Sequence, residues 1–249
     1  MKSIRIGNHD VELYESIDEL PITRFHKFNK YLLVDAGIGS EISDWDAHVE
    51  RTVRYIRSNP DLAIKELENL RQNVHFIQNE LSPKHLAFCV LVKSVDGRCF
   101  EDASDAEIEV IRTLLQEITS SELTANLESV KKKIDDDLQL YFPKLFDDPN
   151  TKEYYDLLRR RGLLMLDQII DKQNRQDEID RLTDQILTFA PPRVFSGSNG
   201  VEVQTDRDFE SMCLLIAQQT HTDPKRFTVL EYYNAFEYVK DNLKRKNKK

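Results

Sequence analysis

The stretch ELPITRFHKFNKYLLVDAGIGSEISDWDAHVERTVRYI, residues 19–56, indicates two helices joined by a short turn. Pro21 suits the first turn of a helix, where its missing N–H would have had no partner. Apolar residues then recur at helical spacing through Leu33, and Gly37 can take the left-handed position that ends a helix. Trp45 begins the apolar stripe of a second helix. The glycines therefore have a structural role, and the two helices can form either an active site or a surface for another protein.

Capping signals indicate further helices along the chain. Asn59 and Pro60 are a cap and a first residue for a third helix. Ser104 and Thr228 each precede a Glu by three residues, which is the capping box that begins a helix. Residues 151–189 contain no proline, but their middle lacks an apolar stripe. This run therefore either breaks in the middle or projects as one exposed helix.

Three segments carry signals for extended structure. Apolar and polar residues alternate on either side of Gly7–Asn8, which predicts an N-terminal β-hairpin. Residues 86–95 are apolar nearly throughout and precede Asp-Gly, so a buried strand with a turn competes with a short buried helix. The helix is favoured because Ser82–Pro83 is a start signal. Residues 193–205, RVFSGSNGVEVQT, have two short apolar runs around a Ser/Gly/Asn loop, which predicts a second hairpin or an extended arm.

The predicted fold is mainly α: a multi-helix bundle with an N-terminal β-hairpin and an extended arm or hairpin near residues 193–205. The chain has only 7 glycines and 8 prolines among 249 residues, which favours helices because all-β folds use many of both in their turns. We expect four parts, namely the hairpin at 1–20, a helical body at 21–190, the arm at 191–205, and a C-terminal helical pair with a basic tail at 206–249.

Composition narrows the classes of function. The formal net charge is −9, so most of the surface should repel a phosphate backbone, and we expect no sequence-specific binding of nucleic acid. The basic end LKRKNKK, residues 243–249, is either a solvated end or a contact with nucleic acid or an acidic partner. The three cysteines lack the paired spacing of metal ligands and indicate a reducing compartment. Because neither a signal peptide nor a membrane-length apolar run is present, we expect a cytoplasmic protein without membrane contact.

Motifs for catalysis and cofactor binding are weak, and we expect no catalytic residue and no cofactor. The GIGS turn lacks the spacing and the Lys-Ser/Thr pair of a phosphate-binding loop. One group could hold a divalent ion, but carboxylates at a helix start favour capping instead. Its members are Asp35, Asp44, Asp46 and His48. Arg159–Arg161 could clamp a phosphate or carboxylate, but consecutive helical residues diverge, so a solvated face or the rim of a protein contact is favoured.

A series of motifs connects the N-terminal hairpin to the segment ELENLRQNVHFIQNE, residues 66–80. They are Glu19-Leu20-Pro21, Arg24, Asn29-Lys30-Tyr31, Gly37-Ile38-Gly39-Ser40, His48 and Asn69-Leu70-Arg71. This combination resembles a group of structural proteins from crAss-like tailed bacteriophages of gut Bacteroidetes. The rest of the chain is similar to that group only in its general helical character.

The resemblance implies a component of the virion or of its assembly, placed in the neck or tail below the portal. Such a protein is expected to assemble in the host bacterial cytoplasm as a ring of identical copies, with twelvefold symmetry as one option, and to bind other neck, tail or portal proteins. We expect interface residues on the first two helices and on the arm, with an ordinary place in the core as the alternative for the aromatic ones. They are Arg24, Phe25, Phe28, Tyr31, Trp45, Phe195, Val201 and Val203.

Two other hypotheses stay open. The first is an assembly chaperone that is present in infected cells but leaves the particle. The second is a helical metal-dependent hydrolase built on the Asp and His group named above.

Overall fold

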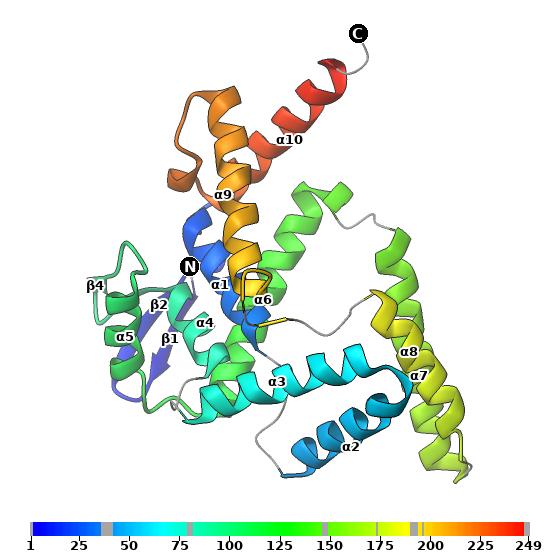
Figure 1. Ribbon diagram of the computed structural model, residues 1–249. Helices are drawn as coiled ribbons and strands as arrows, with labels where there is room; N and C mark the ends of the chain where they lie inside the picture. The colour runs from blue at the N-terminus through cyan, green and yellow to red at the C-terminus, as the bar shows by residue number, and fades with distance from the viewer. Residues whose placement is uncertain are drawn as a thin grey trace. The chain divides into compact units, whose positions relative to one another are not determined.

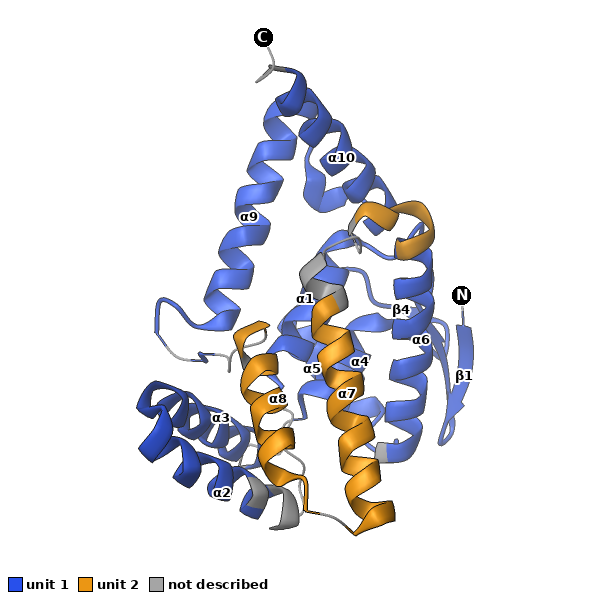
Figure 2. Ribbon diagram, turned by 90° about the vertical axis from the view of Figure 1, so that its right-hand side faces the viewer, with its two compact units in different colours: residues 1–138, 194–249 blue, residues 139–193 orange. Residues whose placement is uncertain are grey.

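The computed structural model describes residues 2–35, 42–78, 82–145, 149–172, 174–189, 194–195 and 197–246. The described chain is mainly helical with a small N-terminal sheet, which confirms the predicted fold class (Figure 1). It divides into two compact units, one of residues 1–138 and 194–249 and the other of residues 139–193 (Figure 2). The predicted helical body at 21–190 is therefore divided between the units.

The elements follow the chain in this order. The strands are β1 (Lys2–Ile6), β2 (His9–Leu13), β3 (Val92–Val95) and β4 (Arg98–Cys99). The helices of the first unit are α1 (Ile22–Val34), α2 (Ile42–Ser58), α3 (Pro60–Gln78), α4 (Pro83–Leu91), α5 (Asp105–Leu114), most of α6 (Ser120–Tyr141), the 3₁₀ turn η2 (Pro224–Arg226), α9 (Val201–Thr220) and α10 (Val229–Lys246). The second unit holds the end of α6, the 3₁₀ turn η1 (Pro143–Leu145), α7 (Pro149–Asp171) and α8 (Gln176–Phe189).

The sheet is antiparallel with the strand order β1-β2-β3-β4. Ile6 pairs with His9 across the turn at Gly7–Asn8, so the predicted N-terminal hairpin is confirmed. Gly7 has a φ of 56°, a left-handed conformation that glycine adopts without steric cost. The second hairpin turns at Asp96–Gly97, where both φ angles are positive, as a two-residue turn between twisted strands requires.

Residues 86–95 form both of the predicted alternatives, a buried helix and then a strand. α4 continues to Leu91, and β3 begins at the next residue. The hydroxyl oxygen of Ser82 accepts the N–H of His85, as the start signal indicated. Val95 pairs with Val11 of β2. The helix ends where the free edge of the N-terminal hairpin takes the following residues as a third strand.

The core of the first unit lies among the sheet, α1, α4 and α5. α1 and α4 pack against each other, and α4 also packs on α5. The largest fully buried apolar side chains of this unit are Leu13, Ile17, Leu20, Phe28, Phe88, Leu91, Phe100, Ile111, Leu115 and Ile134. Within the described chain, no helix is both long and apolar enough to cross a lipid bilayer.

Backbone hydrogen bonds join the two ends of the first unit. The N–H of Ile22, at the start of α1, donates to the carbonyl of Phe227 at 2.9 Å. The N–H of Val229, at the start of α10, donates to the carbonyl of Leu20 at 2.9 Å. The capping box of α10 is complete, because Thr228 and Glu231 exchange backbone-to-side-chain hydrogen bonds in both directions. The hairpin at 1–20 and the helical pair at 206–249 are thus parts of one unit.

The prediction of a hairpin or arm at 193–205 is wrong for residues 201–205, which form the first turns of α9. The loop before them does close, since the N–H of Val201 donates to the carbonyl of Val194 at 2.7 Å. Gly200 is the N-cap, and the following residues continue in helical period to the buried Cys213 and Ile216. This long helical period outweighs the short alternation of Val201 and Val203. Residues 193 and 196 lie outside the described part.

The run at 151–189 breaks in its middle. α7 ends at Asp171 and α8 begins at Gln176, whose N–H is accepted by the side chain of Asn174. α7 and α8 pack on each other around a small core of Leu157, Leu182 and Ile186. Because the central residues have no apolar stripe to bury, folding the run back on itself covers more apolar surface than one straight helix would.

The predicted glycine turn at Gly37 lies outside the described residues. The same holds for the last three residues of the basic tail, whereas Lys244 and Arg245 belong to the last turn of α10.

Candidate protein-interaction site

The hairpin of α2 and α3 encloses polar side chains along its seam. Nδ1 of His48 lies 3.1 Å from Oε2 of Glu66, whose side chain is 4% exposed. Nη1 of Arg51 lies 3.9 Å from the other carboxylate oxygen. Thr52 and Asn69 are also buried, and Thr52 donates its hydroxyl to the carbonyl of His48. The contact between the two helices therefore depends on polar pairing as well as on apolar contact.

Exposed aliphatic residues follow the seam residues one position later. The pairs are His48–Val49, Thr52–Val53, Tyr55–Ile56 and Glu66–Leu67. One residue turns a helix by about 100°, so all four aliphatic side chains are rotated from the seam in the same sense. α2 and α3 run in opposite directions from the single linking residue, and therefore the same rotation places both sets on one side of the hairpin. We call Val49, Val53, Ile56 and Leu67 the α2–α3 apolar face.

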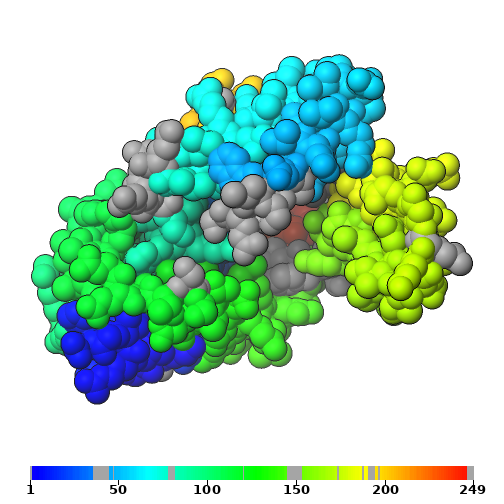
Figure 3. Space-filling model, turned by 90° about the horizontal axis from the view of Figure 1, so that it is seen from below, coloured from blue at the N-terminus to red at the C-terminus, as the bar shows by residue number. Residues whose placement is uncertain are grey.

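The α2–α3 apolar face is open in the folded chain. Its four residues are 48–56% exposed, although the stripe of α2 has the spacing of a core-facing helix. α2 and α3 reach the molecular surface as one continuous region, coloured blue to cyan (Figure 3). In this hairpin, polar side chains lie between the two helices and aliphatic side chains lie on the outer surface. This is the reverse of the usual arrangement of a helical hairpin. Such a surface is typical of a site that another protein covers.

The burial of Glu66 makes this hairpin sensitive to acid. Burial raises the pKa of the carboxyl, but the hydrogen bond from His48 and the charge of Arg51 outweigh burial, so the pKa lies below its ordinary value of 4.5. A carboxyl whose pKa is lowered by folding stabilises the folded state above its unfolded pKa. This contribution is lost as the pH falls through the folded value.

We therefore expect Glu66→Gln to lower hydrogen-exchange protection in α2 and α3 at pH 7 and to lower it less at pH 3, because the wild-type carboxylate loses its stabilising charge as the pH falls through its folded pKa. Comparing both proteins at each pH cancels the intrinsic pH dependence of exchange. The control is Glu50→Gln, on the exposed side of α2, which should change protection at neither pH. An equal loss at both pH values would contradict the assignment.

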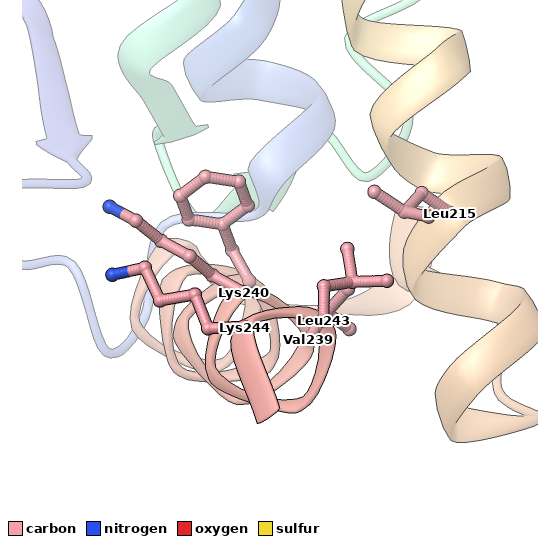
Figure 4. Close-up of a pocket in the computed structure, with 6 residues that line it drawn as sticks. Leu215, Val239, Lys240, Leu243 and Lys244 are labelled. Carbon is pink, nitrogen blue, oxygen red and sulfur yellow. The ribbon is translucent and has the colours of Figure 1, made fainter. Parts of the chain in front are cut away.

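A second exposed apolar feature is a groove between α9 and α10 (Figure 4). We call it the α9–α10 groove; it has a volume of about 250 Å³ and is lined by Leu215, Phe236, Val239, Lys240, Leu243 and Lys244. Lys240 and Lys244 extend their ammonium groups to one side, and Leu215 of α9 borders the other (Figure 4). The groove is smaller than a typical small-molecule site and is suited to one or two aliphatic side chains.

A third apolar surface lies along the second half of α7, where one member, Leu163, also borders a pocket lined by Leu182 of α8. We call it the α7 outer face; its members are Leu163, Met165, Leu166, Ile169 and Ile170, which are 49–73% exposed. In contrast, Leu157 and Leu164 on the same helix belong to or pack against the small core with α8. The second half of α7 is therefore apolar on nearly all sides, although α8 covers only one of them.

No family model, curated protein or solved structure matches this chain. The resemblance to phage structural proteins accordingly depends on the motifs quoted for it.

The structure places three of the predicted interface residues inside the first unit. Arg24 is 1% exposed, and it donates from Nη1 to the carbonyls of Val90 and Val92 at 2.8 and 3.0 Å, and from Nη2 to the carbonyl of Phe100. Its guanidinium also lies over the ring of Tyr14. Phe25 and Phe28 are 8% and 1% exposed. All three are therefore core residues of the folded chain. For the two aromatic residues, a place in the core was the alternative to an interface role.

The other predicted interface residues lie nearer the surface. Tyr31 and Trp45 are half-buried, and burial raises the pKa of the Tyr31 hydroxyl to about 12. Phe195 and Val201 are half-buried on either side of the closed loop. Val203 is 39% exposed on the first turn of α9. An interface role for these residues stays a prediction.

The candidate metal group is not assembled among the side chains that the structure describes. His48 turns toward Glu66 of α3, as given above. Asp35 follows the last residue of α1, and Asp46 is exposed on the first turns of α2. The side chain of Asp44 lies outside the described part. Over the described residues, no group of three His, Cys, Asp or Glu side chains is arranged to hold a metal ion.

Sequence reasoning missed the α7 outer face and the lysines of the α9–α10 groove. The signal for the first was present in LLMLDQII, residues 163–170, which is apolar at too many positions for a helix with one covered side. The signal for the groove was weaker, because Lys240 and Lys244 are spaced like any pair on a solvated helix face.

Proposed function

We propose that this chain is a non-catalytic assembly protein of a tailed-phage particle, in which identical copies associate and exposed helical faces hold neighbouring components. The observation that supports the proposal most directly is the α2–α3 apolar face, where aliphatic side chains lie outside a buried polar seam. A partner that covers this face removes apolar surface from water, which favours association without any change in the fold of the hairpin.

The charge of the chain agrees with this role. A formal net charge of −9 disfavours contact with a phosphate backbone. In a ring around the path of the genome, an acidic surface would let DNA pass without adhering. The resemblance to structural proteins of crAss-like phages supports a position of the proposed ring in the neck or tail.

The proposal is tested with the double substitution Val53→Lys and Leu67→Lys. Both residues are about half exposed, so the monomer should keep its helix content, while two ammonium groups in an apolar contact would have to be desolvated. We expect particles made in a host that supplies only this variant to contain at least tenfold less of the protein. Mass spectrometry of purified particles measures this content.

The matched control is Glu50→Gln with Asp61→Asn, which changes the net charge by the same amount on exposed positions of the same hairpin. Its content in particles should equal that of the wild type. A wild-type protein that is absent from particles but needed for their formation would contradict a structural role and indicate the chaperone instead. A wild-type protein that is neither in particles nor needed for them would remove both.

A further inference from the structure

We propose that the C-terminal end of the chain is a binding site for the phosphate backbone of duplex DNA, without preference for a base sequence. We call residues 240–249, which include the last part of α10, the basic end. This assignment rests on the proposed function, because it names the point at which the ring holds the genome that passes it.

The charge of this chain is divided unevenly along its length. Residues 240–249 contain six Lys and Arg and one Asp, which gives a net charge of +5. Because the whole chain has a net charge of −9, the other 239 residues together carry −14. The acidic majority repels a phosphate backbone, whereas the basic end attracts one. We therefore expect contact with DNA only at this end of the chain.

Within the described part of the chain, no carboxylate neutralises these cations. Lys240, Lys244 and Arg245 are exposed, and none of them forms an ion pair with a described residue. Glu237 and Asp241 are the acidic residues nearest to them in α10, and they form no ion pair with a described residue either. The end of α10 also projects away from the sheet of the same unit (Figure 1). The cations are therefore accessible to a ligand.

Neither the dipole of α10 nor the neighbouring helix offsets this charge. The C-terminal end of a helix has a partial charge equivalent to about −0.5, which is small beside a net +5. α9 contributes Leu215 to the wall opposite the two groove lysines. Residues 211–220 of α9 include no charged residue. Lys240 and Lys244 are four positions apart on one helix, where like charges repel, so an anion from outside the chain would stabilise this end.

The cations of the basic end do not converge on one point. Lys240 and Lys244 extend their ammonium groups to the same side of α10 (Figure 4). Arg245 is the residue after Lys244 and is rotated from it by about 100° around the helix. A single carboxylate or phosphate group is too small to contact all three side chains, whereas a continuous row of anions can do so. The geometry therefore favours a polyanion over a small anionic ligand.

Duplex DNA has a charge density that matches this end. From Lys240 to Lys246, α10 carries four cations along six helical steps, or about 9 Å at 1.5 Å per residue. A duplex carries one negative charge for about every 1.7 Å of its axis, and so presents about five phosphates over that length. A protein partner reaches this density only with many adjacent carboxylates, which repel one another. The observations therefore favour DNA over an acidic protein.

The types of cation indicate contact with phosphates and not with bases. Five of the six cations in the basic end are lysines, which bind phosphate as point charges. Arg245 is the single residue of this end whose side chain can form two parallel hydrogen bonds to one guanine. We therefore expect the same affinity for duplexes of different sequence, in agreement with the expected absence of sequence-specific binding.

The test measures binding of the full-length chain to a fluorescent duplex of about 20 base pairs by anisotropy, at several salt concentrations between about 50 and 200 mM. The variant combines Lys240→Gln, Lys244→Gln and Arg245→Gln. Each lost phosphate contact lowers the slope of log affinity against log salt by about 0.9, so we expect the slope to fall by about 2.7 and the affinity at the lowest salt to fall by about tenfold. Circular dichroism should show unchanged helix content, because all three positions are exposed.

The matched control combines Lys84→Gln, Lys131→Gln and Lys132→Gln, at exposed positions of α4 and α6 in the same unit. It removes the same net charge from a different part of the surface, so its salt slope should equal that of the wild type. A peptide of glutamates with as many charges as the duplex serves as the probe for an acidic protein partner. We expect this peptide to bind more weakly than the duplex at every salt concentration.

Three results would overturn the site. They are a wild type that does not bind the duplex at the lowest salt, equal losses in the variant and the control, and a glutamate peptide that binds at least as tightly as the duplex. The last result would indicate an acidic protein as the partner. If the duplex does not bind but the protein is present in purified particles, the site is wrong and the proposed function is intact. Absence of the protein from particles would remove the proposed function whatever the affinity for DNA.

Discussion

Replacing Arg24 by methionine is expected to lower the free energy of unfolding by about 3–5 kcal/mol, because the substitution leaves three carbonyl groups without a donor, each costing about 1–3 kcal/mol before relaxation. The side chain is 1% exposed and donates to the carbonyls of Val90, Val92 and Phe100. Those carbonyls come from the end of α4, from β3 and from the residue after β4. Arg24 of α1 thereby joins the end of α4, the strand β3 and the segment that follows β4.

Urea unfolding followed by circular dichroism measures this change. The matched control is Arg226→Met, since the side chain of Arg226 is 87% exposed and its ion pair with Asp223 is separated by 3.6 Å at the surface. That substitution should alter stability by less than about 0.5 kcal/mol. Arg24→Lys should fall between the two, because one ammonium group cannot direct donors to three separate carbonyls as a guanidinium does. A change below about 1 kcal/mol for Arg24→Met would contradict the assigned role.

Replacing Phe88 by alanine is expected to lower the free energy of unfolding by about 3–5 kcal/mol, from lost transfer energy and from the cavity left behind. Phe88 is 0% exposed in α4, which packs on both α1 and α5. Phe88→Leu, which refills part of that cavity, should recover some of the loss. Urea unfolding is again the measurement.

The matched control for this prediction is Tyr238→Ala on α10, since Tyr238 is an aromatic residue that is 58% exposed. It removes a side chain of similar size from the surface and should change stability by less than about 0.5 kcal/mol. Equal losses for Phe88→Ala and Tyr238→Ala would mean that α4 is not the centre of the core.

Local signals predicted the ends of several elements well. Ser104 caps α5, Thr228 caps α10 and Asn59 precedes α3, as the sequence indicated. In the capping boxes, the partner groups are three residues apart in the chain. The turn at Gly7–Asn8 is local in the same way, because its glycine and its short loop determine the hairpin. Contacts of this kind exist before any tertiary structure and can be read from neighbouring residues.

Signals that depend on distant residues were ambiguous or misleading. Residues 92–95 form a strand because the edge of β2 is available to pair with them. Val201 and Val203 alternate like a strand, but the helical period that follows them outweighs the alternation. Arg24 was predicted to be an interface residue, because its neighbours in the sequence do not indicate that three carbonyls surround it.

The candidate site shows the same division. The apolar stripe of α2 was visible as Val49, Val53 and Ile56 at spacings of four and three. Its exposure was not visible, because that depends on the polar seam formed with α3, in which His48 meets Glu66 from 18 residues further along the chain.

Helix-forming periodicity, capping residues, the N-terminal hairpin and the acidic charge of this protein are thus properties of its residues alone, since each depends on neighbours in the chain or on simple counts. The tertiary structure decides which side of an amphipathic helix is covered. It also decides which cationic side chain is buried. Coverage is a relation between segments far apart in the sequence, and a periodic pattern specifies an apolar face without specifying what lies against it.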